Sequence, residues 1–300
     1  MTWLRYPKFY RQRLILILLE KAGGALSKMD FQKLLFLLHQ KAGFQYYDFV
    51  PYHYGSYSFQ AASDIEALQA TGWLKSGKKN ITLLKRLSEA RGLSGHETNE
   101  ISRFMKNHKD YRGRRLLHYV YQHYPYYAVK SKIARDVVSK ETYRRIQAER
   151  SRTIKQKPVL YTIGYEGSTF EAYINKLIAN DIHLLCDVRK NPLSRKFGFS
   201  KGILSNVLPK LGIEYLHVQE LGIITQKRKQ LKTKDDYAHL FAEYRESLPE
   251  KATCLQELAV LMESYQRIAL TCFERLPHLC HRHCISDYLK AEKDMVVVHL

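Results

Sequence analysis

Three carboxylates in the C-terminal half each follow a short apolar segment rich in strand-forming residues. These are Glu166, Asp187 and Glu274. Glu166 and Glu274 adjoin aromatic residues, and desolvation by such neighbours raises the pKa of a carboxyl group toward the range useful in acid–base catalysis. We therefore interpret the three as candidate catalytic residues. They could activate water for glycosidic or phosphodiester hydrolysis, or hold a divalent metal ion. Salt bridges to nearby arginines explain each carboxylate equally well.

Basic and hydroxyl side chains in the same segments could bind a phosphate or a carboxylate. A guanidinium group binds such anions through two parallel hydrogen bonds. The residues predicted to bind substrate or phosphate are Arg189, Ser194, Arg195, Arg282 and Tyr165. An alternative stays open for the Asp-x-Arg pattern, because Asp187 and Arg189 could instead pair with other residues of these segments and hold the loops in place.

Cysteine and histidine are concentrated near the C-terminus, where zinc binding is one interpretation. Cys280 and Cys284 are four residues apart, so on a helix they could share one ion, with Cys272 nearby. The spacing is not that of a standard zinc finger or ribbon, so we assign no metal ligands here. A helix N-terminus at 279–282 directed at an anionic group is the favoured explanation. A nucleophilic thiol at Cys272 also stays open.

Alternating strand and helix patterns must position these side chains. Strands are predicted at Val159–Ile163, Ile182–Asp187, Glu214–Val218 and Ile268–Cys272. Helices are predicted between and after them at Thr169–Asn180, Lys201–Leu211, Asp235–Ser247 and Leu255–Glu263. Such alternation is typical of an α/β domain with a mostly parallel sheet, whose strand ends meet at one edge. We therefore expect the candidate site residues to surround one concave pocket there.

Four motifs in this half, in this order, resemble the family of the domain of unknown function 488. They are YTIGYEG at 161–167, CDVRKNPLSRKFGFSK at 186–201, GIEYLHVQELG at 212–222 and TCFERLPHLCHRHCISDYL at 271–289. In the last motif the resemblance concerns Cys272, Cys280, His281 and Arg282. Ile223 stands where many members have a second glycine. The resemblance implies the fold but no activity, because the family has none agreed.

The first ninety residues have the pattern of a mainly helical domain with a hairpin. A helix at Tyr10–Ala22 ends at Gly23-Gly24, Ser27 could cap a second helix, and Ser58 or Ser63 could begin a third. A hairpin follows at 73–84. The stretches FQKLLFLL, FVPYHYGSYSFQ and DIEALQATGWL are similar to winged-helix-type domains of prokaryotic regulatory and defence proteins.

The segment from Ile101 to Lys157 carries sixteen Lys or Arg and four Asp or Glu, over half of the formal net charge of +20. Basic side chains at this density could neutralise phosphates. The interleaved tyrosines could stack on bases or pack in a core. The predicted nucleic-acid-binding residues are Arg112, Arg114, Arg115, Lys130, Lys132, Arg144 and Arg145. We expect a nucleic-acid partner, DNA rather than RNA.

The expected division is a winged-helix-like domain at 1–90, a basic helical segment with its linker at 91–157, and an α/β domain at 158–300. The apolar run Leu14–Leu19 is too short to span a bilayer, so we expect a cytoplasmic protein without a membrane partner. Two functional hypotheses follow. One is an enzyme that hydrolyses a bond in DNA, and the other is a non-catalytic DNA-binding regulator that senses a small anionic ligand.

Overall fold

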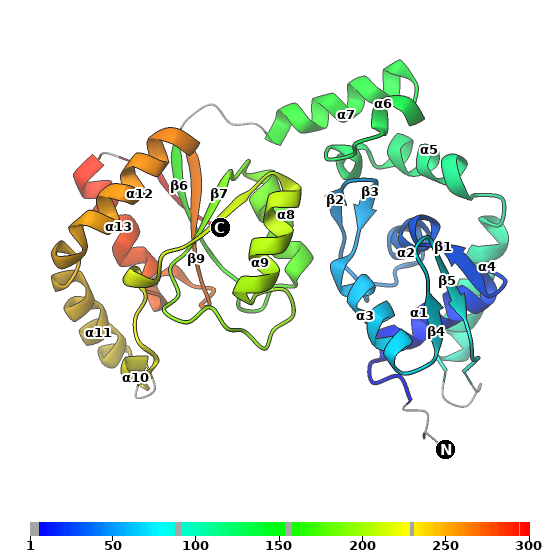
Figure 1. The fold of residues 1–300 in the computed structure, drawn as a ribbon, viewed down its shortest axis with the longest axis horizontal. Coiled ribbons are helices and arrows are strands. Elements are labelled where there is room, and N and C mark those ends of the chain that lie inside the picture. Colours follow the sequence, from blue (N-terminus) through cyan, green and yellow to red (C-terminus); the bar gives the residue numbers. More distant parts are fainter. Residues whose placement is uncertain (1–5, 88–91, 154–157, 229–230, 294) are drawn as a thin grey trace. The chain divides into compact units, whose positions relative to one another are not determined.

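The computed structural model describes residues 6–87, 92–153, 158–228, 231–293 and 295–300 (Figure 1). The chain forms two compact units, Met1–Arg152 and Thr153–Leu300. Two units differ from the three parts expected, because the basic helices do not stand apart from the N-terminal domain. Ile101 and Leu116 are fully buried in the same hydrophobic core as Leu14 and Phe31. Half of the linker expected at 151–158, residues 154–157, lies outside the described residues.

The N-terminal unit is mainly helical. Its helices are α1 (Tyr10–Lys21), α2 (Lys28–Ala42), α3 (Phe59–Ala70), α4 (Gly95–Asn107), α5 (Gly113–His123), α6 (Ala134–Val137) and α7 (Lys140–Thr153), with a 3-10 turn η2 at Pro125–Ala128. Its strands are β1 (Ala25–Ser27), β2 (Val50–Tyr52), β3 (Gly55–Tyr57), β4 (Leu74–Ser76) and β5 (Asn80–Leu83). One antiparallel sheet has the order β1-β5-β4, and β2 pairs with β3 as a separate hairpin.

Local capping explains where α2 and α3 begin and where α1 ends. The Ser27 hydroxyl accepts a hydrogen bond from the Asp30 amide at 2.9 Å, so α2 begins as expected. The Ser58 hydroxyl accepts one from the Ala61 amide at 3.2 Å, which fixes the start of α3 at the first of the two predicted serines. Gly23 follows α1 with a φ of +91°, a left-handed conformation that favours glycine and ends the helix.

The C-terminal unit is an α/β domain with a five-stranded sheet. Its strands are β6 (Val159–Gly164), β7 (Leu184–Asp187), β8 (Glu214–His217), β9 (Arg267–Cys272) and β10 (Val297–His299). Its helices are α8 (Phe170–Ala179), α9 (Lys201–Val207), α10 (Thr225–Arg228), α11 (Lys234–Glu246), α12 (Ala252–Tyr265) and α13 (Arg282–Lys293), with 3-10 turns η3 (Leu208–Leu211), η4 (Gln219–Leu221), η5 (Pro249–Lys251) and η6 (Pro277–Leu279). The order is β10-β6-β9-β7-β8 and every pairing is parallel. The predicted α/β class and parallel sheet are confirmed, and β10 was not predicted.

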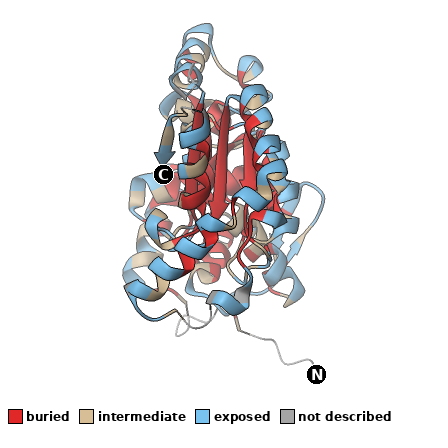
Figure 2. Cartoon of the chain, turned by 90° about the vertical axis from the view of Figure 1, so that its left-hand side faces the viewer, coloured by how far each residue is buried: buried red, intermediate tan, exposed pale blue. Residues whose placement is uncertain are grey.

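Helices cover both faces of this sheet, and its three central strands, β6, β9 and β7, are buried (Figures 1 and 2). Leu160, Leu184 and Leu270 belong to one hydrophobic core with buried residues of α11, α12 and α13. Side chains alternate between the two faces of a strand, so their neighbours Leu185 and Thr271 point to the other face. There Thr271 accepts a hydrogen bond from Tyr173 of α8 at 2.8 Å. Among the described residues, no helix combines the length and the apolar composition needed to cross a bilayer.

One lysine of the N-terminal unit is buried without a carboxylate in hydrogen-bond contact. Lys33 is 2% exposed, and its ammonium group donates a hydrogen bond to the Ser56 carbonyl at 2.7 Å. Burial lowers the pKa of Lys33 to about 7, and the charge of Asp30 opposes this only in part. Between about pH 7 and about pH 10.4, the unfolded chain therefore binds a proton at this site that the folded chain has lost.

We therefore predict that the free energy of unfolding of this unit rises with pH across that window, and that Lys33→Met removes this rise. Both tryptophans, Trp3 and Trp73, belong to this half of the sequence, so urea unfolding followed by tryptophan fluorescence measures it. Lys28→Met is the matched control, because Lys28 is an exposed lysine at the start of the same helix. Equal pH dependence in the wild type and in Lys33→Met would contradict the prediction.

Candidate functional site

The loops after β6, β9, β7 and β8 lie along one edge of the sheet, because these four strands are adjacent and parallel. Two glycines allow the loops to approach closely. A Cβ atom on Gly164 would lie 1.8 Å from the carbonyl oxygen of Glu274, and one on Gly222 would lie 2.2 Å from the amide nitrogen of Lys190. The close backbone contact in this loop is thus made by Gly222. Ile223, at the position where many family members have a second glycine, packs in the hydrophobic core and is 8% exposed.

A buried ion pair follows β7. Asp187 is fully buried and Arg189 is 6% exposed. The Arg189 Nε donates to Asp187 Oδ1 at 2.7 Å, and its Nη2 donates to Oδ2 at 2.5 Å. Its Nη1 donates to the Tyr165 hydroxyl and to the Phe199 carbonyl, both at 2.8 Å. The Tyr215 hydroxyl completes the group with a 2.7 Å hydrogen bond to Asp187 Oδ2. The pair thus holds together segments that follow β6 and β7.

The surroundings of Arg189 keep its guanidinium group charged. Burial lowers the pKa of Arg189, but the hydrogen bonds and the charge of Asp187 outweigh it and leave the pKa above its usual value. Burial raises the pKa of Tyr215, and the Asp187 charge raises it further. The two hydrogen bonds between them direct the side chains of Asp187 and Arg189 toward each other inside the protein. The predicted catalytic role of Asp187 and the predicted binding role of Arg189 stay predictions, and the geometry favours the alternative in which they hold the loops.

The other predicted binding residues near this ion pair, Tyr165 after β6 and Ser194 and Arg195 after β7, differ in exposure. Tyr165 is 4% exposed and stacks on Phe199, with ring centroids 4.3 Å apart. The Lys196 ammonium group donates to the Tyr165 carbonyl at 2.9 Å, and Ser194 accepts from the Lys196 amide at 3.1 Å. Arg195 is exposed and Ser194 is half-buried. Arg195 is therefore the predicted phosphate ligand of this loop that is open to solvent.

Arg282, at the start of α13, is fully buried rather than turned toward solvent. Its Nη1 donates to the Glu274 carbonyl, and its Nη2 donates to the Arg275 carbonyl at 2.9 Å. Its buried Nε has no hydrogen-bond partner within the described part of the chain. The guanidinium group thus fixes the loop after β9 to α13, whereas the sequence suggested an open anion clamp. The reason is that the loop backbone folds back over the helix start and presents two carbonyl oxygens there.

Glu166 and Glu274 lie on the two neighbouring loops after β6 and β9. Glu166 is exposed, and its carboxylate accepts a hydrogen bond from the Arg275 amide at 3.0 Å. Its own amide donates to the Phe273 carbonyl at 2.9 Å. Glu274 is half-buried, and its Oε2 accepts a hydrogen bond from the Cys272 thiol at 3.3 Å. The two candidate catalytic carboxylates are thus tied to the same loop, residues 273–275.

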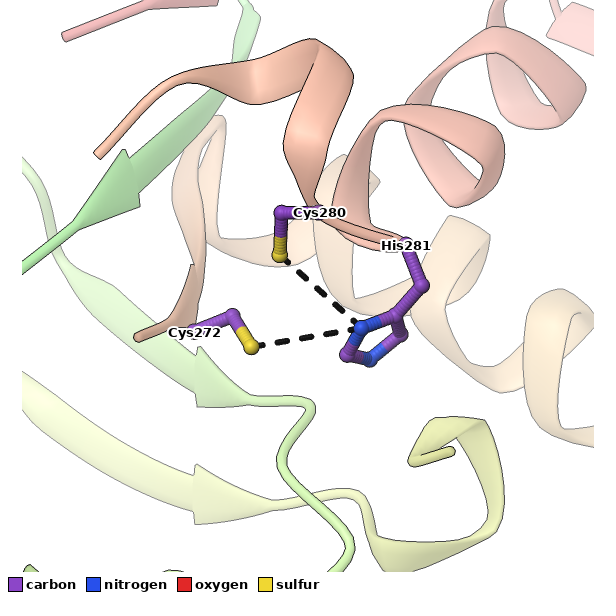
Figure 3. A group of neighbouring side chains, drawn as sticks. All are labelled: Cys272, Cys280 and His281. Atoms are coloured by element: carbon purple, nitrogen blue, oxygen red, sulfur yellow. Dashed lines mark hydrogen bonds between the residues drawn. The ribbon is translucent and has the colours of Figure 1, made fainter. Parts of the chain in front are cut away.

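Cys272, Cys280 and His281 converge beside that loop (Figure 3). All three are buried, with His281 Nδ1 lying 3.9 Å from Cys272 Sγ and 3.8 Å from Cys280 Sγ. The His281 Nε2 lies 2.8 Å from the Val188 carbonyl oxygen, which can only accept a hydrogen bond. Nε2 therefore carries the proton, and in the neutral ring Nδ1 offers its lone pair to the two sulfurs. Among the described residues, these three form the one group of His, Cys, Asp and Glu side chains close enough to share a metal ion.

The pairing of Cys280 with Cys284, suggested by their spacing, is wrong. Cys280 has an extended backbone and precedes α13, so the two cysteines are not one helical turn apart. Cys284 instead contacts the His283 ring, with its Sγ 3.5 Å from Nε2. Cys272, which is distant in sequence, takes the place beside Cys280. Burial raises the pKa of the Cys280 thiol well above its usual value, and Cys272 and Glu274 raise it further. This argues against Cys280 as a free thiolate nucleophile.

The basic residues of the N-terminal unit are mostly open to solvent. Six of the seven predicted to bind nucleic acid are exposed: Arg114, Arg115, Lys130, Lys132, Arg144 and Arg145. Arg112 is half-buried and donates hydrogen bonds to the His108 carbonyl at 3.0 Å and the Tyr111 carbonyl at 2.7 Å. Arg114 donates to the Asp136 carbonyl. The exposed basic residues lie on or between α5 and α7. The hydrogen bonds of Arg112 connect the end of α4 to the start of α5.

The tyrosines among these charges mainly pack in the protein. Tyr121 is fully buried, and Tyr124 and Tyr127 make edge-to-face contacts with Phe36, with ring centroids 5.0 Å and 4.5 Å apart. Tyr111 and Tyr119 pack against the same core. Of the two interpretations of these rings, the geometry favours core packing over base stacking.

Several residues that build the site were not predicted from the sequence. Tyr215 completes the Asp187 group, Phe199 stacks on Tyr165, and His217 lies with Nε2 2.9 Å from the Arg189 carbonyl. Tyr215 and His217 alternate along β8 within the third motif, so that motif's polar residues were the available signal. The position of β8 beside β7, which brings them to Asp187, is a property of the sheet order.

The ion pair leads to a stability prediction. We expect Asp187→Ala to destabilise the C-terminal unit by about 3–5 kcal/mol, because it leaves a buried guanidinium group without its counter-charge. The double variant Asp187→Ala/Arg189→Met should lose less than the sum of the two single variants. Opening free energies from hydrogen exchange of the β7 and β9 amides measure both quantities. Losses below about 1 kcal/mol in both single variants would show that the pair does not hold this edge together.

The comparison with known proteins concerns the same half of the chain. No curated protein matches this chain. A family model described as a domain of unknown function, DUF488, matches residues 169–289. The match begins at the cap of α8 and ends within α13, so it includes three of the four motifs and the Cys272–Cys280–His281 group. The C-terminal unit thus matches, over residues 169–289, the family that its motifs predicted, the domain of unknown function DUF488.

Proposed function

We propose that this protein binds nucleic acid through the exposed basic residues of 114–145, and that the C-terminal unit processes a nucleotide or a flipped base at the edge formed by the carboxyl ends of its strands. The observation that carries the proposal is the exposure of the six predicted basic side chains in this stretch. They are accessible for phosphate contacts, because the adjacent aromatic rings rather than the charges fill the core.

The topology of the N-terminal unit supports DNA as the partner. Its order α1–β1–α2–α3–β4–β5, with β1 beside β5 of the β4–β5 hairpin, is compatible with the proposed likeness to a winged helix, to which β2–β3 would add one hairpin. In helix-turn-helix proteins the second helix of the motif reads bases in the major groove. Here α3 contains no Lys or Arg, whereas Lys75, Lys78 and Lys79 lie on or between β4 and β5. We therefore expect backbone contacts with little sequence preference.

Binding should be strongly salt-dependent. If about five phosphates are neutralised, the logarithm of the association constant should fall with the logarithm of salt concentration with a slope of roughly −4 or steeper. The variant Arg115→Gln/Arg144→Gln/Arg145→Gln should bind about tenfold more weakly and show a slope reduced by roughly 2 to 3. Fluorescence anisotropy with a labelled duplex, measured over a series of salt concentrations, tests both expectations.

A matched variant separates local contacts from the net charge of the protein. Lys210→Gln/Lys232→Gln/Lys290→Gln removes three exposed charges from the C-terminal unit and should leave affinity and slope nearly unchanged. Equal weakening by the two triple variants would mean that charge alone attracts DNA. Binding that is absent at low salt, or unaffected by salt, would refute the proposed interface.

The proposed chemical step is hydrolysis of a glycosidic or phosphodiester bond, with Glu166 and Glu274 as proton-transferring groups. Both come from loops that follow adjacent parallel strands, and both are held by hydrogen bonds around residues 273–275. Glu166 is exposed and Glu274 is half-buried, so two carboxyl groups in different surroundings are available. Arg195 and Lys196 on the loop after β7 supply positive charge for a phosphate.

Replacing either carboxylate by its amide tests this step. Glu166→Gln and Glu274→Gln should each lower turnover by at least about a hundredfold, because each removes a proton acceptor but keeps the shape of the side chain. DNA affinity should remain within about twofold of wild type. The assay measures strand breaks and alkali-labile abasic sites in labelled single- and double-stranded DNA, with and without Mg²⁺ or Mn²⁺. Glu257→Gln, an exposed carboxylate on α12, is the control.

A non-catalytic regulator that senses a small anionic ligand is the second candidate. The observation that favours it is that Asp187 is occupied by its ion pair with Arg189, whereas Arg195 remains exposed to an anion. A nucleotide that binds near Arg195 and changes DNA affinity, with no turnover of any nucleic acid, would favour this function. Full activity in both glutamine variants would refute the carboxylate mechanism.

A further inference from the structure

We propose that Cys272, Cys280 and His281 bind a zinc ion as its three protein ligands. The sequence spacing alone gave no standard zinc motif, because the first sulfur comes from the end of a strand. The tertiary structure brings two sulfurs and one imidazole nitrogen within 4.8 Å of one another. Thiolate and imidazole are the ligand types that zinc takes in proteins, whereas Mg²⁺ and Ca²⁺ require oxygen ligands.

The separations fit one tetrahedral ion. Zinc–sulfur bonds of about 2.3 Å and zinc–nitrogen bonds of about 2.0–2.1 Å place neighbouring ligand atoms about 3.5–3.8 Å apart. The two nitrogen–sulfur separations are 3.9 Å and 3.8 Å. Small side-chain movements therefore suffice to coordinate the ion. Glu274 lies outside this group, although its Oε2 accepts a hydrogen bond from the Cys272 thiol at 3.3 Å.

The histidine is already oriented for coordination. The Val188 carbonyl accepts the Nε2–H proton at 2.8 Å, which directs the Nδ1 lone pair at the two sulfurs (Figure 3). Metal-bound histidines usually have such a partner on their second nitrogen, which fixes both the tautomer and the ring orientation. The Tyr244 ring packs edge-on against the His281 ring at 5.4 Å and restricts it further.

The site would join three segments that are far apart in sequence. Cys272 ends β9, Cys280 and His281 precede α13, and Val188 follows β7. All three proposed ligands are buried, and the half-buried Glu274 lies next to Cys272. The zinc proposal does not depend on nucleic-acid binding or on hydrolysis, so it can fail while the proposed function holds.

Metal content of the full-length protein tests the proposal directly. After expression with zinc and extensive dialysis, elemental analysis should find about one zinc ion per chain. Protein stripped with a chelator and refilled with Co²⁺ should show thiolate-to-cobalt charge transfer and the intense visible bands of tetrahedral cobalt. Less than about a tenth of an equivalent of zinc, together with no cobalt–thiolate absorption, would overturn the proposal. So would a Cys272–Cys280 disulfide in freshly purified protein.

Variants identify the ligands. Cys272→Ser, Cys280→Ser and His281→Ala should each weaken zinc affinity at least tenfold, measured by competition with a chromophoric chelator. Cys284→Ser is the matched control, because Cys284 is as buried as Cys280 and lies four residues away but outside the group. It should retain one zinc ion and wild-type affinity. If a ligand variant does not fold, the cobalt spectrum of the wild type decides, since it detects thiolate ligands without mutation. Wild-type affinity in all three ligand variants would refute the assignment.

Discussion

A charged pair buried at the end of a strand must be satisfied from several directions at once, because an unpaired charge there costs several kcal/mol. In this protein the pair is Asp187–Arg189, and its partners are the Tyr165 and Tyr215 hydroxyls and the Phe199 carbonyl. These groups come from segments that follow β6 and β7, and from β8 itself. The pair therefore determines where the loops at this edge lie, and with them the candidate functional residues.

Two polar groups flank the end of β7 and serve different purposes. The Asp187–Arg189 pair comes from residues on either side of Val188, whose carbonyl oxygen accepts the hydrogen bond from His281. The ion pair is charged and saturated by hydrogen bonds. The group of Cys272, Cys280 and His281 is buried and brings two sulfurs and one imidazole nitrogen together. Because both depend on three consecutive residues, a shift of the β7 end would disturb both groups.

Close backbone contact makes this arrangement sensitive to side-chain size. Gly164 lies against the Glu274 carbonyl and Gly222 lies against Lys190, so a methyl group at either position would push two loops apart. The Arg282 guanidinium group then ties the Glu274 carbonyl to the start of α13. The half-buried Glu274 is consequently held in place by backbone contacts of its own loop, which supports the proposed role in proton transfer, because that role requires a fixed position.

Aromatic and basic side chains of the N-terminal unit differ in burial. Aromatic residues of α5 and η2 pack around Phe36, whereas the basic residues of the same stretch remain outside. Aromatic rings gain most from burial, and a guanidinium or ammonium group loses its hydration there. Lys33 of α2 is a basic residue that is buried, and its lowered pKa reflects that cost. A positively charged surface over an aromatic core follows from this separation.

The sequence by itself determined the elements of the C-terminal unit. The strands Val159–Gly164 and Arg267–Cys272 lie within one residue of their predicted bounds, because buried parallel strands are continuous apolar runs that end at polar motif residues. It also identified the candidate carboxylates and the exposed basic residues. Strand β10 was not predicted, although Val297–His299 contains two β-branched residues. A segment of three residues is too short to show the alternation of apolar and polar residues that indicates a strand.

Only the tertiary structure decided which side chains meet. Local spacing paired Cys280 with Cys284, but the extended backbone at Cys280 breaks the helical register. The insertion of β9 between β6 and β7 then places Cys272 beside Cys280 and His281. Strand order depends on how the whole sheet packs between its helices, and no local pattern encodes it. For the same reason, the inward direction of Arg282 became visible only once the loop after β9 was seen to fold over α13.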